Sequence, residues 1–345
     1  MRIMLLLFSI NCFGQAKQVF KNLALEGGGV RGIAYAGAFK ILEEKNILQK
    51  IENVAGTSAG AIAGLMICIG YNATEIDSIM MSIHYQKFND GKGGLLGKYR
   101  RVKRKFGLYK GDEFENWLEN MLLAKTGNAN LTFAGLHQMK IKSNLYKDLY
   151  CTGTNISRQQ LEIFSYKNSP NLPLATAVRI SSTIPLYFAP IPLDDSMHKI
   201  NKADTTKYIN YYVDGGMLCN YPISMFDSCK VGGEPVLCND LVFNEQTIGI
   251  KLERPEQIEN YLNNSNKIPK YNPKSFKDYM SAFGNLMMET MERKYPNLEN
   301  EKGRTIFISY GNVSAKIKKM SYKSKRELFE NGVKGVEAFL ALKAL

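Results

Sequence analysis

The stretch Ile51-Glu52-Asn53-Val54-Ala55-Gly56-Thr57-Ser58-Ala59-Gly60 carries the strongest signal for the fold of this 345-residue chain. Residues 51–55 have the composition of a short strand, and the apolar residues after the serine recur at helical spacing, namely Ile62, Leu65, Met66 and Ile69. Glycines two positions before and after Ser58, with the small Ala59 beside it, are typical of a nucleophile elbow, a strained turn that exposes the serine hydroxyl. A tight glycine turn with an incidental serine explains this segment alone equally well.

A second glycine cluster, Gly27-Gly28-Gly29-Val30-Arg31-Gly32, lies between the apolar run Leu23–Leu25 and a segment of helical periodicity. Glycines at such a junction leave backbone N–H groups directed outward at the positive end of a helix, where they suit a phosphate or the oxyanion of a tetrahedral intermediate. The run also matches G-x-G-x-x-G with Glu52 twenty residues after Gly32, the pattern of a dinucleotide site. A glycine-rich connection without a ligand is a third interpretation.

The third motif, Val213-Asp214-Gly215-Gly216, follows the aromatic run Tyr208–Tyr212. An aspartate at a strand end followed by two glycines can present its carboxylate to a cleft, although Asp-Gly-Gly is also a common turn. A serine nucleophile needs a base. The histidines are His84, His137 and His198. None of them lies beside glycines at the end of a predicted strand. The sequence therefore favours a Ser58–Asp214 dyad over a Ser–His–Asp triad.

Taken together, these motifs resemble those of the patatin-like phospholipases, lipid acyl hydrolases that use a Ser–Asp dyad. Gly27–Gly32, including Arg31, match the family's oxyanion loop, Gly56–Gly60 match its nucleophile elbow, and Asp214–Gly216 match its aspartate motif. Residues 177–190 resemble the family's stretch between the serine and the aspartate. The order and spacing of the motifs also fit, and the resemblance covers most of the chain from about residue 20 onward.

This resemblance implies an α/β fold of three layers, α/β/α, around a mostly parallel central sheet. It implies that Ser58 attacks the carbonyl of a lipid ester, and that Asp214 accepts the serine proton and later activates water to release the acyl-enzyme. Backbone N–H groups around Gly28 and Gly29, with that of Ala59, would stabilise the oxyanion, and losing one such donor typically costs ~3 kcal/mol. The reaction would need no cofactor, no metal and no calcium.

Arg31 has three interpretations within this scheme. It orients the glycine loop, meets a lipid phosphate, or is a solvated arginine in the first turn of a helix.

Two alternatives to a lipid hydrolase follow from the same motifs. A membrane-binding protein with a vestigial site would keep Ser58 and Asp214 without activity. A nucleotide-dependent oxidoreductase would use Gly27–Gly32 as a dinucleotide loop, but it would leave Gly56–Gly60 and Asp214–Gly216 without a role.

The remaining sequence predicts one large α/β domain over residues 17–345, with a core at about 20–230 and a C-terminal extension packed on it. Strands alternate with helical patterns, which favours a mostly parallel sheet. Further strands are expected at 149–155, 247–252 and 305–309, a packing helix from Ser324, and loops at 86–112 and 194–207.

The net charge of +13 comes largely from two clusters of basic residues. The first comprises Lys98, Arg100, Arg101, Lys103, Arg104 and Lys105. The second, looser cluster comprises Lys316, Lys318, Lys319, Lys323, Lys325 and Arg326, and a solvated face explains it as well. No nucleic-acid-binding motif accompanies either cluster, so nucleic acid is not an expected partner. Apolar residues interleave the first cluster, which favours binding to an anionic membrane surface, with each basic residue contributing ~1 kcal/mol.

Residues 1–16 have a charged start, a short apolar core and small residues at Gly14 and Ala16, which favours a signal peptide cleaved after Ala16 over a buried first strand. The expected location is periplasmic, secreted or peripherally membrane-associated, or cytoplasmic if this segment is not a signal. Cleavage would leave five cysteines, with Cys68 and Cys151 expected to be buried. One bridge among Cys219, Cys229 and Cys238 is expected if the protein is exported.

Overall fold

The computed structural model of the chain describes residues 19–200, 208–230, 232–238, 240–263, 273–275, 279, 282, 301–313, 317 and 319–343. The predicted signal peptide at 1–16 lies outside the described residues, as do residues 201–207 of the second predicted loop and two lysines of the second basic cluster, Lys316 and Lys318.

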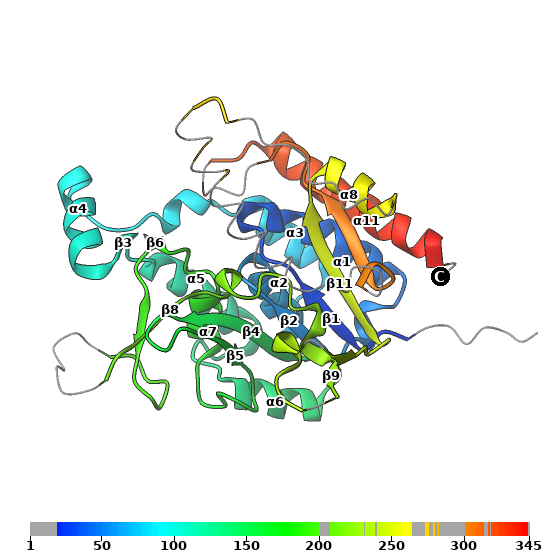
Figure 1. Ribbon diagram of the computed structural model, residues 1–345, viewed down its shortest axis with the longest axis horizontal. Helices are drawn as coiled ribbons and strands as arrows, with labels where there is room; N and C mark the ends of the chain where they lie inside the picture. The colour runs from blue at the N-terminus through cyan, green and yellow to red at the C-terminus, as the bar shows by residue number, and fades with distance from the viewer. Residues whose placement is uncertain are drawn as a thin grey trace, which may run out of the picture.

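A mixed sheet organises the described residues (Figure 1), with strand order β12-β11-β1-β2-β4-β8-β7 and β5 paired to β4. Five neighbouring strands are parallel: β12 (Thr305–Ser309), β11 (Thr247–Glu253), β1 (Asn22–Leu25), β2 (Asn53–Gly56) and β4 (Asp148–Asn155). Three strands at the other end are antiparallel to their neighbours: β8 (Asn210–Asp214), β7 (Ile191–Leu193) and β5 (Gln160–Phe164). The expected mostly parallel sheet is therefore confirmed, as are the strands expected at 149–155, 247–252 and 305–309.

Helices flank this sheet. They are α1 (Ala34–Glu44), α2 (Ala59–Cys68), α3 (Ala73–Ser82), α5 (Asp112–Thr126), α6 (Phe133–Lys142), α7 (Leu174–Ser181), α8 (Pro255–Leu262) and α11 (Tyr322–Lys343). The row of Leu23, Val54 and Leu149 crosses three parallel strands in register and is fully or almost fully buried. Gly64 of α2 lies directly over Val54 and Leu149, so this row forms the core beneath the helices.

The opposite face of the sheet carries small residues. Ala24 and Gly249 are paired in register, and a Cβ atom on Gly249 would lie only 2.0 Å from the hydroxyl oxygen of Tyr221. Ala55 belongs to a second apolar cluster on this face with Cys219, Met225 and Val236. Small side chains let the segment after β8 approach the strands closely, and this segment supplies η4 (Gly215–Met217), η5 (Ile223–Phe226), η6 (Pro235–Leu237), β9 (Ser228–Cys229) and β10 (Leu241–Val242).

The cysteines follow the sequence-based expectations. Cys68 and Cys151 are buried and free, and Cys219 is also buried. Cys229 and Cys238 form a disulfide that closes the segment over the second face of the sheet.

The prediction of a loop over residues 86–112 is wrong. This segment contains η3 (Tyr85–Phe88), α4 (Gly94–Lys105) and β3 (Gly107–Tyr109), and β3 pairs in parallel with β6 (Leu186–Phe188). Arg101 closes the segment, because its Nε donates to the Leu108 carbonyl at 2.8 Å and its Nη1 to the Lys92 carbonyl at 2.7 Å. These contacts of Arg101 with residues before and after α4 stabilise a helix that the sequence did not predict.

Figure 1 shows α4 standing apart from the sheet at one end of the molecule, and none of its side chains is buried. Within the described residues, no helix combines the length and the apolar character needed to cross a bilayer.

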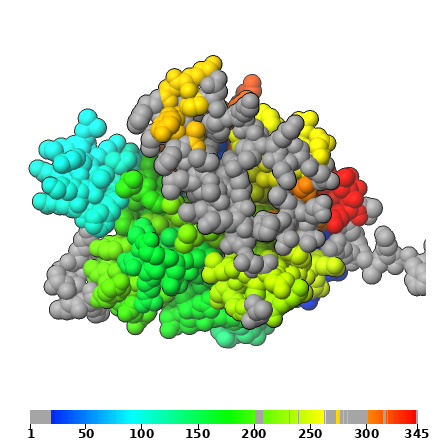
Figure 2. Space-filling view, in the orientation of Figure 1, coloured from blue at the N-terminus to red at the C-terminus, as the bar shows by residue number. Residues whose placement is uncertain are grey.

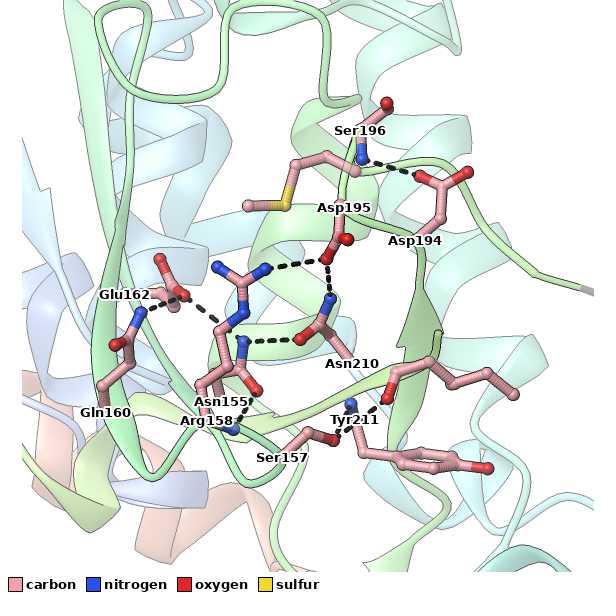
Figure 3. A network of polar contacts seen from close by, with 12 residues as sticks. Asn155, Ser157, Arg158, Gln160, Glu162, Asp194, Asp195, Ser196, Asn210 and Tyr211 are labelled. Carbon is pink, nitrogen blue, oxygen red and sulfur yellow. Dashed lines mark hydrogen bonds and ion pairs between the residues drawn. The ribbon is translucent and has the colours of Figure 1, made fainter. Parts of the chain in front are cut away.

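Residues 194–200 do form a loop, as expected, and a polar network fixes it to the sheet (Figure 3). Asp195 Oδ1 accepts hydrogen bonds from Arg158 Nη2 at 2.7 Å and from Asn210 Nδ2 at 2.8 Å. Asn155 Nδ2 in turn donates to Asn210 Oδ1 at 3.3 Å. The network therefore joins β4, the loop and the first residue of β8, the strand that ends in Asp214.

The contact between α1 and α11 depends on two glycines that allow close approach. A Cβ atom on Gly332 would lie 2.0 Å from the Ala34 carbonyl oxygen, and one on Gly37 would lie 1.9 Å from the Phe329 carbonyl oxygen. We expect Gly332→Ala to lower the free energy of unfolding by about 1–3 kcal/mol, because the helices must move apart. Thermal unfolding would measure this, with the exposed Lys334→Ala in the same helix as the control. Equal melting temperatures for the two variants would contradict the close helix contact.

Candidate active site

The sheet topology brings the three sequence motifs together. The glycine cluster follows β1 and the serine turn follows β2, and these strands are parallel neighbours, so both turns lie at the same edge of the sheet. Gly56 at the end of β2 pairs with Cys151 of β4, and Asp214 at the end of β8 pairs with Gly153. β4 therefore pairs with the end of β2 and with the end of β8 only two residues apart, which brings these two strand ends together.

Ser58 occupies a strained backbone conformation, with φ of 53° and ψ of −117°, directly before α2. The flanking glycines are required by space. A Cβ atom on Gly56 would lie 2.4 Å from the Gly60 carbonyl oxygen, and one on Gly60 would lie 2.2 Å from the Leu25 carbonyl oxygen. This is the geometry of a serine at the tip of a sharp strand-to-helix turn.

The hydroxyl of Ser58 meets the carboxylate of Asp214. Ser58 Oγ donates to Asp214 Oδ2 at 2.8 Å, and Asp214 Oδ1 accepts the Gly216 N–H at 2.8 Å. Both residues are nearly closed to solvent, with exposed fractions of 9% for Ser58 and 7% for Asp214. Burial raises the pKa of the Asp214 carboxyl to about 7, and the hydrogen bonds from Gly216 and Ser58 oppose this rise. The carboxyl therefore changes protonation state close to neutral pH.

The glycine cluster lies against this pair. The Gly27 N–H donates to the Asn220 carbonyl oxygen at 3.0 Å, and the Cβ position of Gly27 lies 3.2 Å from Ser58 Cβ. Across the described part of the chain, we find no protein acceptor for the backbone N–H groups of Gly28, Gly29 and Ala59. These groups begin η1 (Gly29–Ile33) and α2, so they are available to an anion at the ends of two short helical segments.

Arg31 and Gly32, at the end of the glycine cluster, bind it to the C-terminal part of the chain and to α2. Arg31 Nε donates to the Val313 carbonyl at 2.7 Å, and its guanidinium carbon lies 3.4 Å from the centroid of the Tyr310 ring. A Cβ atom on Gly32 would lie 2.9 Å from Ala59 Cβ, so the cluster packs against the start of α2. Of the three roles considered for Arg31, these contacts favour holding the glycine cluster in place.

Several residues at this site were not singled out from the sequence. Ser181 Oγ accepts the Ser58 N–H at 3.0 Å, and the Thr183 carbonyl accepts the Asp214 N–H at 2.8 Å. Thr57 Oγ1 lies 2.6 Å from Thr152 Oγ1 in a contact that joins β2 to β4. The backbone carbonyl of Asn220 accepts the Gly27 N–H, and the Asn220 side chain donates to the Gly27 carbonyl at 3.3 Å. Ser181 and Thr183 lie within residues 177–190, and the family resemblance of that stretch was the signal for them. Ser181 and Ser58 are 123 residues apart in sequence, so the contact itself could not be read from the chain.

The histidines occupy other places. His137 Nδ1 lies 2.8 Å from Asp148 Oδ1 at the amino end of β4, away from the strand end that carries Ser58. His198 is largely exposed in the 194–200 loop beside Asp194, and His84 directly precedes η3. Among the residues that the structure describes, no three His, Cys, Asp or Glu side chains are grouped to hold a metal ion.

Comparison with known proteins gives consistent results. A family model described as patatin-like phospholipase matches residues 23–227. The protein YqhO of Bacillus subtilis is 31% identical over 319 residues, which cover 91% of this chain and 96% of YqhO. A protein of Invertebrate iridescent virus 6 described as a probable lipid hydrolase, 463L, is 26% identical over 220 residues, covering 62% of this chain and 65% of the viral protein.

The fold resembles a solved structure as well. The crystal structure of VipD from Legionella pneumophila superposes with a TM-score of 0.57 at 17% sequence identity, covering 93% of this chain and 67% of VipD. The likeness supports the α/β/α arrangement described above.

The raised pKa of Asp214 has a consequence for stability. Because the folded carboxyl has a pKa of about 7 and the usual value is 3.8, the folded state binds a proton that the unfolded state has lost. This stabilisation is fully present below pH 3.8 and is lost as the pH rises through about 7. We therefore expect Asp214→Asn, which keeps a neutral group here, to be more stable than the parent above pH 7 by up to about 4 kcal/mol.

Chemical denaturation of both proteins from pH 4 to pH 9 measures this difference, which should be small at pH 4 and grow until about pH 7. Asp112→Asn is the control for the loss of an exposed carboxylate. A difference that stays constant with pH would mean that the folded carboxyl ionises normally.

Proposed function

Because the chain belongs to the patatin-like phospholipase family, we propose that it is a serine lipid acyl hydrolase of the phospholipase A or lysophospholipase type. The observation that carries this proposal is the 2.8 Å hydrogen bond between Ser58 Oγ and the buried carboxylate of Asp214. A hydroxyl that donates to a buried base, on a strained turn at a strand end, is arranged for nucleophilic attack.

The chemistry would proceed in two steps. Ser58 Oγ attacks the ester carbonyl while Asp214 takes its proton, and Asp214 then gives that proton to the departing alcohol, which leaves an acyl group on Ser58. In the second step Asp214 takes a proton from water as the hydroxide attacks the acyl-enzyme. Asp214 then returns this proton to Ser58 Oγ as the bond to the acyl group breaks and the fatty acid is released. A carboxylate of ordinary pKa is a weak base, so the rise to about 7 improves its match to neutral pH.

The glycine cluster supports the proposal as a candidate oxyanion site. The N–H groups of Gly28, Gly29 and Ala59 are available to the negative oxygen that forms when Ser58 attacks. Gly27 and Gly32 bring the cluster against Ser58 and the start of α2. This packing favours the oxyanion interpretation over a dinucleotide loop, which would have no need of the serine turn. The mechanism as written uses no cofactor and no calcium.

An anionic membrane surface is the proposed partner, and α4 would bind it. Leu95, Leu96 and Tyr99 are exposed by 86%, 63% and 65%. Leu95 and Tyr99 lie one helical turn apart on one face of α4. Figure 2 shows this part of the chain, in cyan, projecting at one side of the molecule. Arg100, Lys103 and Lys105 are exposed around this face. An apolar stripe flanked by basic residues fits a helix that lies in the interface of a bilayer.

The other members of this basic cluster have contacts within the protein. Arg101 closes the segment as described above, and Lys98 lies 5.0 Å from the centroid of the Tyr109 ring. Arg104 also has a contact. We therefore expect Arg100, Lys103 and Lys105 to provide most of the attraction to anionic lipid.

We also propose that the protein is exported. The disulfide between Cys229 and Cys238 supports this, because such bonds persist in oxidising compartments.

The test of the hydrolase is fatty-acid release from mixed phospholipid vesicles without calcium. We expect Ser58→Ala and Asp214→Ala each to lower the rate by at least about 10³-fold, because each removes a member of the reacting pair. In the parent, kcat/KM should rise with pH through a single ionisation near pH 7. Ser82→Ala, at an exposed serine of α3, is the control.

Labelling with a soluble fluorophosphonate separates an enzyme from a vestigial site, because only an activated Ser58 reacts. No release from phospholipid, lysophospholipid or a short-chain ester, together with no labelling, would leave a membrane-binding protein as the better interpretation.

The membrane proposal is tested with Ser58→Ala as the background, so that binding is measured without turnover. We expect the further changes Arg100→Glu, Lys103→Glu and Lys105→Glu together to weaken binding to vesicles with anionic lipid by at least about 100-fold, since each lost charge costs ~1 kcal/mol. Lys40→Glu, Lys45→Glu and Lys50→Glu, at exposed lysines at and beyond the end of α1, form the matched control. Equal binding by the two triple variants would disprove the role of α4.

A further inference from the structure

Arg179 of α7 is the largest side chain that is fully buried in the described structure, with an exposed fraction of 0%. Burial lowers the pKa of its guanidinium to about 10, which still leaves the group charged at neutral pH, and Glu115, Asp90 and Asp112 oppose this fall. The guanidinium carbon lies 4.6 Å from the centroid of the Phe188 ring. A buried charge is costly unless its hydrogen bonds are satisfied, so its partners indicate what it is retained for.

The partners of Arg179 come from two separate segments. Nε donates to the Gly111 carbonyl at 3.0 Å and Nη2 donates to the Lys110 carbonyl at 2.9 Å, both directly after β3. Nη1 donates to Thr183 Oγ1 at 2.5 Å, just beyond the end of α7. The side chain therefore joins the base of the α4–β3 segment to the C-terminal end of α7.

Gly111 shows how closely this joint is fitted. Its φ is +80°, and a Cβ atom at this position would lie 1.8 Å from Arg179 Nη2. A residue with a side chain would meet both backbone strain and a clash with the guanidinium.

The end of α7 also holds both members of the proposed dyad by their backbones. Ser181 Oγ accepts the Ser58 N–H, and the Thr183 carbonyl accepts the Asp214 N–H. Thr183 Oγ1 donates to the Arg179 carbonyl at 2.7 Å while accepting from the guanidinium, so residues 179 and 183 are bound to each other twice. A shift of this turn would move Ser58 and Asp214 relative to each other.

We propose that Arg179 is a positioning residue for the Ser58–Asp214 pair, because it locks the turn that holds both residues to the base of the α4–β3 segment. The inference rests on the proposed hydrolase function. The planar guanidinium reaches three acceptors in fixed directions, and a lysine ammonium on a flexible stem does not reproduce that arrangement. A misplacement of about 1 Å in such a site can cost about 100-fold in rate.

The experiment compares Arg179→Lys with Arg304→Lys. Arg304 is a second buried arginine, and its two Nη atoms each lie 2.6 Å from a carboxylate oxygen of Asp227. Asp227 follows η5, on the sheet face opposite α2, so this variant loses buried hydrogen bonds without touching the turn at 179–183. Both variants are measured for melting temperature, for kcat and KM on phospholipid vesicles, and for the rate at which a soluble fluorophosphonate labels Ser58.

We expect Arg179→Lys to lower kcat and the labelling rate together by about 10- to 100-fold. KM should be nearly unchanged, because Arg179 positions the reacting pair and does not bind the substrate. Arg304→Lys should lower the melting temperature and leave kcat and labelling close to those of the parent. Equal losses of labelling in the two variants at similar melting temperatures would overturn the proposal, since the effect would then be general destabilisation.

Thr183→Val decides the question if Arg179→Lys does not fold. This variant keeps the arginine and the shape of residue 183 but removes the hydroxyl that connects them, and it should also slow labelling of Ser58. A folded Thr183→Val or Arg179→Lys that labels as fast as the parent would overturn the proposal while leaving the hydrolase function standing. Failure of the parent itself to label would overturn the proposed function and this inference with it.

Discussion

The hydrogen bond between Ser58 Oγ and the buried carboxylate of Asp214 is the interaction on which the surrounding structure depends. A carboxyl group closed off from water favours its neutral form, and the hydrogen bonds that Gly216 and Ser58 donate to it favour the charged form. The two residues are separated by 156 positions in sequence. Their meeting requires that β2 and β8 end at neighbouring positions along β4, Cys151 and Gly153, which fixes the register of both strands. The antiparallel β8 is therefore as necessary to the site as the parallel strands.

The region beyond the matched family segment takes part in this site. Residues 23–227 carry the three motifs. Yet β11 lies directly beside β1, and its Leu252 would be 2.6 Å from a Cβ atom on Gly28. Arg31 reaches across to Val313 and Tyr310, which follow β12. The glycine cluster is thus held between the serine turn on one side and the C-terminal part of the chain on the other. The C-terminal region is better regarded as part of the support of the site than as a covering layer.

The α4–β3 segment links the surface of the molecule to its interior. Its outer part presents exposed apolar and basic residues, and its base is bound to α7 through the buried Arg179. A connection of this kind would suit the proposed enzyme, because the proposed membrane-binding surface and the Ser58–Asp214 pair would keep a fixed relation. The sequence showed the charges of this segment but not its helix. The contacts that stabilise this helix, from Arg101 to the carbonyl groups of Leu108 and Lys92, are not visible in the sequence.

Local patterns determined much of this protein. Glycines at positions 56 and 60 predicted the turn at Ser58, because only glycine fits beside backbone atoms at such short distances. Alternating strand and helix patterns predicted the mostly parallel sheet, and the order of the motifs indicated the family. Tertiary structure alone decided which groups surround the pair. The contacts of Ser181, Thr183, Asn220 and Arg179 join segments far apart in sequence, and a single sequence records neither which side chains meet nor how far they are removed from water. The pKa of Asp214 is the clearest case, since burial, and not the residue type, moves it to about 7.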